Sequence, residues 1–264
     1  MIVDTSLFEV IDRDSFEEHV FEMYMDNVAP ESLSLGYIAR KDELRLNIGD
    51  EEYLIKQSIS ALNSNNKDGT TGFVTWSASK VVVEWLFQRG NRVFSAIKGS
   101  TVLELGSGVS GLVACTIGRQ CRQYVCTDQQ GVMKLLKSNI ITNGDGFYSS
   151  TIETDYHPRS EKAPRLDAVV YDWEQQDTRA IQEVMDKHPD FIITCDTIYN
   201  PYLIPYLVRS IETLAGPETG VLVGLQLRET GLLSEFLDAG LDRFRIYYVP
   251  KVQDGYAVYY MEKI

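Results

Sequence analysis

A glycine-rich turn is the first place where residue types and spacing could support chemistry. Residues 104–111 (ELGSGVSG) lie between an expected strand and an expected helix, where residues without a Cβ let the backbone approach a ligand. The spacing G-x-G-x-x-G is typical of NAD-dependent oxidoreductases. Glu104, however, precedes Gly106 by two residues, and a carboxylate there suits a cationic ligand. A sulfonium methyl donor that carries an amino acid fits, whereas the oxidoreductase interpretation depends on the glycine spacing alone.

An acidic residue at the end of the next expected strand supports nucleotide binding. Asp128 closes the strand expected at 124–127 and follows Gly106 by 22 residues. A carboxylate in this position can accept hydrogen bonds from ribose hydroxyls. Because NAD and S-adenosylmethionine both contain ribose, Asp128 indicates a nucleotide without choosing between them. The alternative is that the glycine turn serves only the close packing of a helix.

Alternating strands and helices must position these residues. Strands are expected at 101–105, 124–127, 166–172, 190–195, 219–227, 243–249 and 255–262. Helices are expected at 79–89, 110–119, 130–141, 178–187, 202–214 and 230–239. This alternation predicts an α/β fold with a Rossmann-like, mostly parallel seven-stranded sheet. No helix separates the last two strands, so they should form a C-terminal antiparallel hairpin.

The N-terminal residues have a different pattern and predict an extension. Residues 12–27 have the apolar spacing of an amphipathic helix, and residues 42–56 alternate as a β-hairpin around Gly49-Asp50. The polar segment 63–71 (NSNNKDGTT) then indicates a loop. We therefore divide the chain into an acidic extension, residues 1–66, and a second domain, residues 67–264. The polar segment 144–165 is expected to be a loop or a small insertion.

The charge of the chain restricts its partners. The 264 residues carry a formal net charge of −13, and residues 1–60 alone hold 14 acidic and 5 basic side chains. A polyanion or an anionic membrane surface requires Lys and Arg, so we expect neither direct nucleic-acid binding nor membrane binding. The acidic extension is either a solvated surface or an electrostatic dock for a basic protein substrate.

Cysteine and histidine usage argues against metal chemistry. The four cysteines show no C-x-x-C spacing and the three histidines are scattered, so we expect free thiols in a reducing compartment and no zinc site. The first ten residues lack the pattern of a signal peptide, and no apolar stretch reaches the length of a membrane span. These features predict a cytoplasmic protein, and a monomer is favoured.

Several short runs, taken together, resemble the seven-β-strand S-adenosylmethionine-dependent methyltransferases over about residues 70–262. These runs are 71–76 (TGFVTW), 102–108 (VLELGSG), Thr127-Asp128, Asp172-Trp173 and 196–199 (DTIY). Within that class the chain is similar to the lysine methyltransferases called family 16, which modify non-histone proteins. Two upstream runs, 18–24 (EHVFEMY) and 57–60 (QSIS), are similar to the fungal ribosomal lysine methyltransferase 5 family. That resemblance implies a lysine on the large-subunit stalk protein near the tRNA exit side.

The resemblance also implies which residues bind S-adenosylmethionine, and hence the product S-adenosylhomocysteine. Besides Glu104 and Asp128, these residues are Trp76 bordering the donor, Gly106, Ser107 and Gly108 approaching it by backbone, Trp173 lying against the adenine, and Cys195 in contact with it. An indole offers a flat apolar face to a purine or a sulfonium. Core packing is the alternative for both tryptophans and for Cys195. The family turn commonly reads G-x-G-x-G, whereas Gly111 here comes one residue later.

The run Asp196–Tyr199 matches the acid-x-x-Tyr motif of the family and follows a strand, where open α/β sheets bind ligands. Methyl transfer is an in-line displacement by a neutral amine, whereas free lysine has a pKa of about 10.4. We expect Asp196 to orient the lysine and Tyr199 to provide an aromatic wall and a hydroxyl. The alternative is that Asp196 caps the next helix.

The sequence thus predicts a protein-lysine N-methyltransferase that needs no metal, because a sulfonium is already an activated leaving group. Two other classes of function remain open. One is an NAD-dependent oxidoreductase, and the other is a non-catalytic module that keeps the fold and recruits a basic partner.

Overall fold

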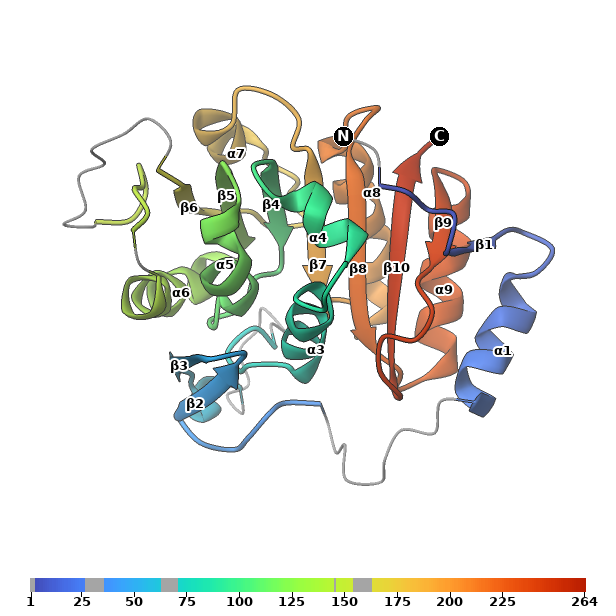
Figure 1. The fold of residues 1–264 in the computed structure, drawn as a ribbon, viewed down its shortest axis with the longest axis horizontal. Helices are drawn as coiled ribbons and strands as arrows, with labels where there is room; N and C mark the ends of the chain where they lie inside the picture. Colours follow the sequence, from blue (N-terminus) through green and yellow to red (C-terminus); the bar gives the residue numbers. More distant parts are fainter. Residues whose placement is uncertain (1–2, 27–35, 63–70, 145, 154–162) are drawn as a thin grey trace.

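A computed structural model describes residues 3–26, 36–62, 71–144, 146–153 and 163–264. Its centre is a sheet of eight strands in the order β1-β9-β10-β8-β7-β4-β5-β6 (Figure 1). The strands of this sheet are β1 (Glu9–Ile11), β4 (Thr101–Leu105), β5 (Gln123–Asp128), β6 (Arg165–Val170), β7 (Phe191–Cys195), β8 (Gly220–Gln226), β9 (Phe244–Tyr248) and β10 (Tyr256–Lys263). A separate hairpin consists of β2 (Glu43–Ile48) and β3 (Glu51–Lys56).

The strand directions confirm the predicted α/β fold. β8, β7, β4, β5 and β6 run parallel to one another, and β10 pairs antiparallel with both β8 and β9. The chain passes from β4 outward to β5 and β6 and then returns to the other side of β4 as β7. The order of the strands therefore reverses between β4 and β7, and open α/β sheets bind ligands at the carboxyl ends of the strands beside such a point.

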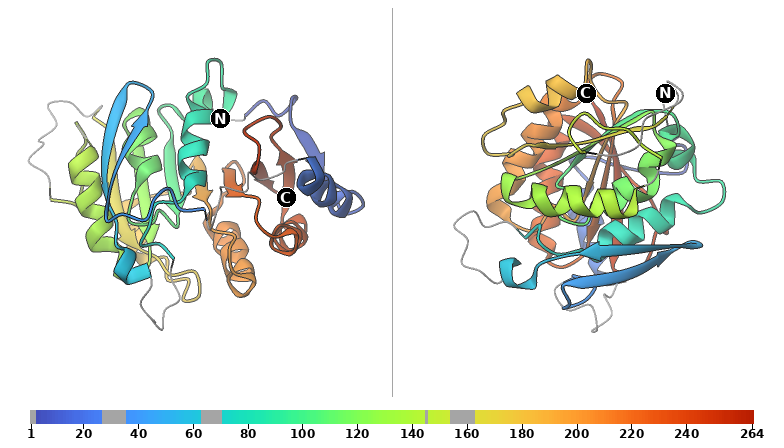
Figure 2. Two further views of the ribbon diagram at one scale, coloured as in Figure 1. Left: turned by 90° about the horizontal axis from the view of Figure 1, so that it is seen from below. Right: turned by 90° about the vertical axis from the view of Figure 1, so that its left-hand side faces the viewer.

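Helices cover both faces of the sheet (Figure 2) and enclose two apolar cores. One core is formed with α3 (Ser77–Leu86), α4 (Arg92–Ile97), α5 (Leu112–Ile117), α6 (Gln130–Asn143) and the β2–β3 hairpin. The other is formed with α1 (Phe16–Asp26), α7 (Arg179–Val184), α8 (Ile204–Leu214) and α9 (Thr230–Leu241). The short α2 (Ile59–Leu62) follows the hairpin. A parallel sheet buried on both faces explains why its central strands read as continuous apolar runs.

The N-terminal residues join the molecule in two separate places (Figure 1). β1 pairs antiparallel with β9, and α1 packs on α9, at one edge of the sheet. The β2–β3 hairpin instead packs on α6, toward the opposite edge. The sequence analysis missed β1, so the predicted sheet of seven strands gains an eighth. The proposed division between residues 66 and 67 lies outside the described residues, as does most of the polar loop at 63–71.

Two asparagines of α6 hold the hairpin in place. The Asn139 side chain exchanges two hydrogen bonds with the backbone of Lys56, at 2.8 and 2.6 Å, and Asn143 does the same with Leu54, at 2.7 and 2.9 Å. The Asn139 amide also donates to the carbonyl of Val109, at 2.7 Å. These side chains satisfy one edge of β3 as a neighbouring strand would, and Asn139 connects the hairpin directly to the glycine turn.

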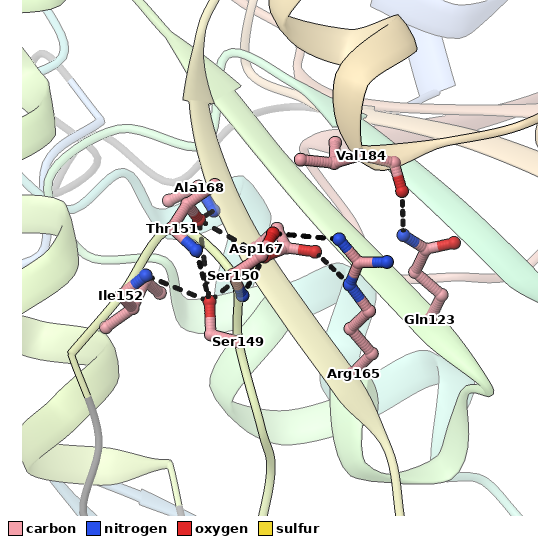
Figure 3. A network of polar contacts seen from close by, with 9 residues as sticks. All are labelled: Gln123, Ser149, Ser150, Thr151, Ile152, Arg165, Asp167, Ala168 and Val184. Atoms are coloured by element: carbon pink, nitrogen blue, oxygen red, sulfur yellow. Dashed lines mark hydrogen bonds and ion pairs between the residues drawn. The ribbon is translucent and has the colours of Figure 1, made fainter. Parts of the chain in front are cut away.

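The described part of segment 144–165 covers the outer edge of the sheet (Figure 3). Tyr148 forms a parallel bridge with Arg165 at the start of β6. The carboxylate of Asp167 is fully buried, forms an ion pair with Arg165 at 2.6 Å, and accepts hydrogen bonds from Ser149 and Ser150. A buried charge requires such partners. The segment therefore shields an edge strand whose exposed backbone groups could otherwise pair with another chain.

The helices follow the predictions with two differences. α1 begins at Phe16, later than predicted, because Asp12 accepts hydrogen bonds from the backbone of Asp14 and Ser15 and forms a turn before the helix. The second difference is that α2 and α4 were not predicted. In the parts of the chain that the structure describes, no helix is long and apolar enough to cross a membrane.

Candidate active site

A cleft of about 580 Å³, part of it open to solvent, lies at the carboxyl ends of β4, β5 and β7. Eight of the predicted site residues line it: Trp76, Gly106, Gly108, Asp128, Trp173, Cys195, Asp196 and Tyr199. The lining residues that the sequence analysis did not assign are Thr71, Gly72, Gln129, Tyr171, Asp172, Thr197 and Leu203. The fold thus brings residues from five separate stretches of the sequence into one cavity.

The glycine turn has a backbone that other residues adopt only with strain. Gly106 and Gly108 have φ angles of +72° and +60°, in the left-handed region that favours glycine. A Cβ on Gly106 would lie 2.7 Å from the Thr197 side chain and 3.0 Å from the Trp173 ring. The backbone N–H groups of Gly106 and Ser107 both donate to the Thr127 carbonyl at 3.0 Å, which fixes the turn against β5.

Asp128 is a buried carboxylate that faces the cleft without a cation. It is 8% exposed, and its two oxygens accept hydrogen bonds from the backbone of Gly108 and Gln129, both at 2.8 Å. Burial raises its pKa to about 6, and the two backbone hydrogen bonds lower it. No ion pair of Asp128 is found among the described residues. Each carboxylate oxygen has a second lone pair, so Asp128 can still accept hydrogen bonds from the two hydroxyls of a ribose.

Glu104 and Ser107 belong to the same turn but do not line the cleft. The Glu104 side chain is 2% exposed and lies beneath the turn, where the thiol of Cys126 donates to its carboxylate at 3.9 Å. Burial raises the pKa of Glu104 to about 7, and the charge of Asp128 adds to the increase. The direct contacts predicted between these two residues and the donor therefore stay predictions.

Aromatic side chains form two walls of the cleft. Trp76, just before α3, donates its indole N–H to the Thr71 carbonyl at 3.2 Å and meets the ring of Tyr37 edge-on at 6.3 Å. Trp173 lies against Gly106, as the distance to an added Cβ shows. Tyr199 is held at Thr71 by hydrogen bonds, and its burial raises the pKa of the phenol.

Asp196 takes a strained position at the end of β7. Its φ of +59° is in the left-handed region, which a non-glycine residue adopts only when its surroundings hold it there. Its backbone N–H donates to Gly224 at 2.7 Å, and its buried carboxylate forms an ion pair with Arg228 at 2.5 Å. Burial raises the pKa of Asp196, and the Arg228 guanidinium lowers it. Asp196 does not cap the next helical turn, since Asn200 accepts the hydrogen bond from Tyr202 there.

Arg228 supports this site without lining the cleft, and it was not predicted from the sequence. It follows β8, and its guanidinium lies 5.1 Å from the centre of the Trp76 ring. The available signal was weak: a single charged residue just after an apolar strand, in the sequence QLRE. Arg228 can pair with Asp196 only because β8 lies beside β7, and the sequence alone does not reveal this strand order.

The comparisons with known proteins agree with this geometry. A family model described as lysine methyltransferase matches residues 56–239, which is more than half of the chain. The chain belongs to the lysine methyltransferase family. The family match decides against the oxidoreductase interpretation, and so does the antiparallel β10 between β8 and β9, which the dinucleotide-binding order of strands lacks.

Relatives of this lysine methyltransferase cover almost its whole length. It is 28% identical to ribosomal lysine N-methyltransferase 5 of Zygosaccharomyces rouxii, over 89% of this chain and 91% of the relative. The corresponding protein of Kluyveromyces lactis is 29% identical, over 88% and 90%. Among solved structures, the methyltransferase SMU.776 complexed with SAH superposes with a TM-score of 0.53 at 12% identity, over 85% of this chain and 57% of that one. The last similarity concerns the fold alone.

The family also defines the chemistry of the cleft. This lysine methyltransferase is an enzyme that uses S-adenosylmethionine as methyl donor. Within the described ranges, no group of three or more His, Cys, Asp and Glu side chains is arranged to hold a metal ion. All four cysteines are buried and have free thiols.

Proposed function

We propose that this lysine methyltransferase modifies a lysine of a large-subunit ribosomal protein. The observation that best supports the proposal is that one cleft combines two different halves. The glycine turn and Asp128 form a half that suits a nucleotide. Trp76, Asp196 and Tyr199 form a second half with aromatic and acidic side chains. The names of the relatives, which cover about nine tenths of both chains, support a ribosomal substrate. The stalk protein near the tRNA exit side is the substrate that we favour.

The first half of the cleft fits the donor. Asp128 would accept hydrogen bonds from the ribose, the glycine turn would leave room for close approach, and Trp173 would lie against the adenine. The buried carboxylate of Asp128 already accepts one backbone hydrogen bond on each oxygen, and the second lone pair of each oxygen would accept the ribose hydroxyls. The donor supplies a methyl group on a sulfonium, which leaves as a neutral thioether without help from a metal. The product would be S-adenosylhomocysteine.

The second half of the cleft fits a lysine side chain. Trp76 and Tyr199 would enclose its methylene groups, and Asp196 would fix the direction of the amine toward the methyl carbon. In-line displacement depends on this alignment, and holding two reactants in position contributes much of an enzymatic rate. Trp76 also borders the donor half, so it would separate the aliphatic part of the lysine from the ribose.

Within the acidic extension, we favour helix α1 as the dock for a basic substrate. In the hairpin, Glu51 pairs with Arg119 and Glu52 pairs with Arg45, so these two charges are already balanced. The outward face of α1 carries Glu17, Glu18 and Glu22, all exposed, and no ion pair is found for them among the described residues. Phe21 and Met25 on the same face are 65% and 62% exposed. We infer that this acidic face of α1, residues 17, 18, 21, 22 and 25, attracts the basic substrate.

The substrate can be identified with ribosomes that lack the modification. Saccharomyces cerevisiae has its own ribosomal lysine N-methyltransferase 5, and ribosomes from a strain without it provide an unmodified acceptor. Incubation with the purified protein and radiolabelled donor, followed by mass spectrometry, should show a methylated lysine on a large-subunit protein. Label only on a protein outside the ribosome would refute the ribosomal proposal. Donor binding without any transfer would favour the non-catalytic module. The cytoplasmic location and the monomeric state remain predictions.

A further inference from the structure

Arg228 connects the acidic residue of the acceptor half to its aromatic wall. Its Nη2 atom lies 2.5 Å from a carboxylate oxygen of Asp196 and 3.1 Å from the side-chain oxygen of Gln226. The Arg228 Cζ atom also lies over the Trp76 ring, 5.1 Å from its centre. Asp196 and Trp76 both line the cleft, whereas Arg228 does not. Arg228 therefore acts on the cleft from behind, through these two side chains.

The surroundings hold Arg228 in this position. An added Cβ on Gly36, whose φ is +84°, would lie only 2.2 Å from Arg228 Nη2, so the N-terminal segment packs directly on the guanidinium. The phenol of Tyr24 in α1 donates to the carbonyl of the next residue, Glu229, at 2.8 Å. A guanidinium fixed in one geometry is a permanent positive charge, because arginine does not lose its proton in proteins.

The charge of Asp196 matters because the target lysine must enter as a free amine. The lysine nitrogen attacks the methyl carbon as the carbon–sulfur bond breaks, and the bonding electron pair leaves with sulfur. An ammonium group has no lone pair for this step, so its proton must first pass to water. An unpaired carboxylate beside the amine would favour the ammonium form and raise the lysine pKa by about 1–3 units.

We propose that Arg228 is a positioning residue that cancels the charge of Asp196, so that Asp196 orients the lysine without holding it protonated. This inference rests on the proposed role of Asp196 at the acceptor half. The Asp196 side chain is fully buried, and one carboxylate oxygen has only a long contact, 3.4 Å, to the Gln226 backbone. That oxygen keeps a lone pair for a neutral amine, which would reach it once the substrate displaces the side chains that cover the carboxylate.

Other titratable groups also face this region. They are Cys195 and Tyr199 after β7, Asp128 and Asp172 across the cleft, Tyr37 on Trp76, and Tyr24 and Glu229 beside the Arg228 backbone. None of these groups is itself substituted in the Arg228 and Asp196 variants, and the double variant, which removes both charges, corrects for the influence of either charge on neighbours such as Cys195. Their contribution to a pH profile is therefore common to all variants, and differences between variants report on the ion pair.

The test is the pH dependence of kcat in four proteins at saturating donor. The acceptor is acid-extracted large-subunit protein from the yeast strain that lacks its own enzyme. kcat under these conditions reports ionisations in the complex with both substrates. The acidic limb of the kcat–pH profile is the range in which kcat rises with pH as the lysine loses its proton. Arg228→Gln keeps a hydrogen-bond donor but leaves the Asp196 charge unbalanced, so this limb should move to higher pH by about one unit or more. Asp196→Asn leaves the guanidinium unbalanced, so the limb should move to lower pH.

The double variant Arg228→Gln/Asp196→Asn restores neutrality and should return the acidic limb to the wild-type position, even if kcat at its plateau is lower. Arg228→Lys retains the charge and should leave the limb in place. As a matched control, Arg243→Gln breaks the exposed ion pair with Glu212 and should change nothing. A loss of structural support alone would not produce shifts of opposite sign that cancel in the double variant.

Three results would overturn the inference: an unmoved limb in Arg228→Gln, an equal shift in Arg228→Lys, or no restoration in the double variant. If Arg228→Gln does not fold, the Asp196→Asn variant tests the inference by itself. An acidic limb that does not move to lower pH in this variant would contradict the proposed cancellation of charge. Absence of any methyl transfer by the wild-type protein would instead refute the proposed acceptor, so the two failures are distinct.

Discussion

The two halves of the cleft are built in different ways. Apart from Trp173, the donor half comes from one stretch of the sequence, the turn after β4 and the end of β5, and backbone hydrogen bonds determine most of its geometry. The acceptor half combines the N-terminal segment, the residues before α3, the end of β7 and the residue after β8. On the proposed assignment, a common donor would be held by local structure, whereas the acceptor would be recognised by side chains that only the tertiary fold brings together.

The largest expected effect tests the donor half. Asp128→Ala should weaken donor binding about 100-fold, since two hydrogen bonds to a charged group contribute about 1.5 kcal/mol or more each. Isothermal titration with S-adenosylhomocysteine measures the Kd. The matched control, Asp177→Ala, removes an exposed carboxylate paired with Arg179 and should leave the Kd unchanged. A change of less than threefold for Asp128→Ala would show that Asp128 does not contact the ribose.

The second prediction concerns stability and pH in the same half. Burial raises the pKa of Glu104 from 4.5 to about 7, so the native state binds the proton more tightly than the unfolded state. The free energy of unfolding of the donor-free protein should therefore fall as pH rises from about 4.5 to about 7, by about 3 kcal/mol from this group. Asp128 contributes in the same direction between pH 3.8 and about 6.

Glu104→Gln removes this titration, so the variant should gain stability relative to the wild type as pH rises toward 8. Urea denaturation at several pH values measures the difference. Glu235→Gln, a substitution at an exposed position, is the control and should leave the pH dependence of stability unchanged. If the curves of Glu104→Gln and wild type are parallel, Glu104 does not ionise over this range.

A third prediction addresses the acceptor half. Tyr199→Phe removes a hydroxyl that hydrogen bonds at Thr71, and we expect kcat to fall about fivefold, which corresponds to one hydrogen bond of about 1 kcal/mol. The Kd for S-adenosylhomocysteine should stay within twofold. Tyr202→Phe, three residues away and 59% exposed, is the matched control. Equal kcat in both variants and wild type would remove the Tyr199 hydroxyl from the reaction.

The smallest effect is expected from the acidic face of α1. Glu17→Gln, Glu18→Gln and Glu22→Gln together should raise the acceptor KM about fivefold at low salt, because exposed charges contribute only a few tenths of a kcal/mol each. The difference should shrink at high salt. Glu51→Gln/Glu52→Gln in the hairpin is the control, since both side chains already have arginine partners. An unchanged KM would mean that the α1 charges serve only solubility.

The sequence could predict the donor half because its signals are local. The glycine turn and Asp128 lie within 25 residues of each other, on elements whose apolar patterns are strong. Asp196 and Tyr199 were found in the same way, from their place at the end of an apolar strand. The family match and the strand order confirm the fold and the chemistry that these residues indicated.

Arg228 and β1 could not be predicted because their roles depend on neighbours distant in sequence. Arg228 acquires its partner only when β8 lies beside β7, and a lone arginine after a strand otherwise indicates a solvated surface. β1 has three residues, Glu9–Ile11, too few for a periodic pattern, and only its pairing with β9 makes it a strand. For Glu104 the sequence predicted the position in the glycine turn, but it could not predict that the side chain is buried away from the cleft.

The two hydrogen bonds between Asn139 and Lys56 have a consequence for shortening this protein. A chain that began at residue 67 would keep every residue that lines the cleft. It would also leave the Asn139 amide, which is fully buried at present, without its partners on β3. The same amide supports the Val109 carbonyl in the glycine turn. The family model begins at residue 56, the point where this link is made. The smallest autonomous enzyme should therefore include the hairpin, even though no residue of the hairpin lines the cleft.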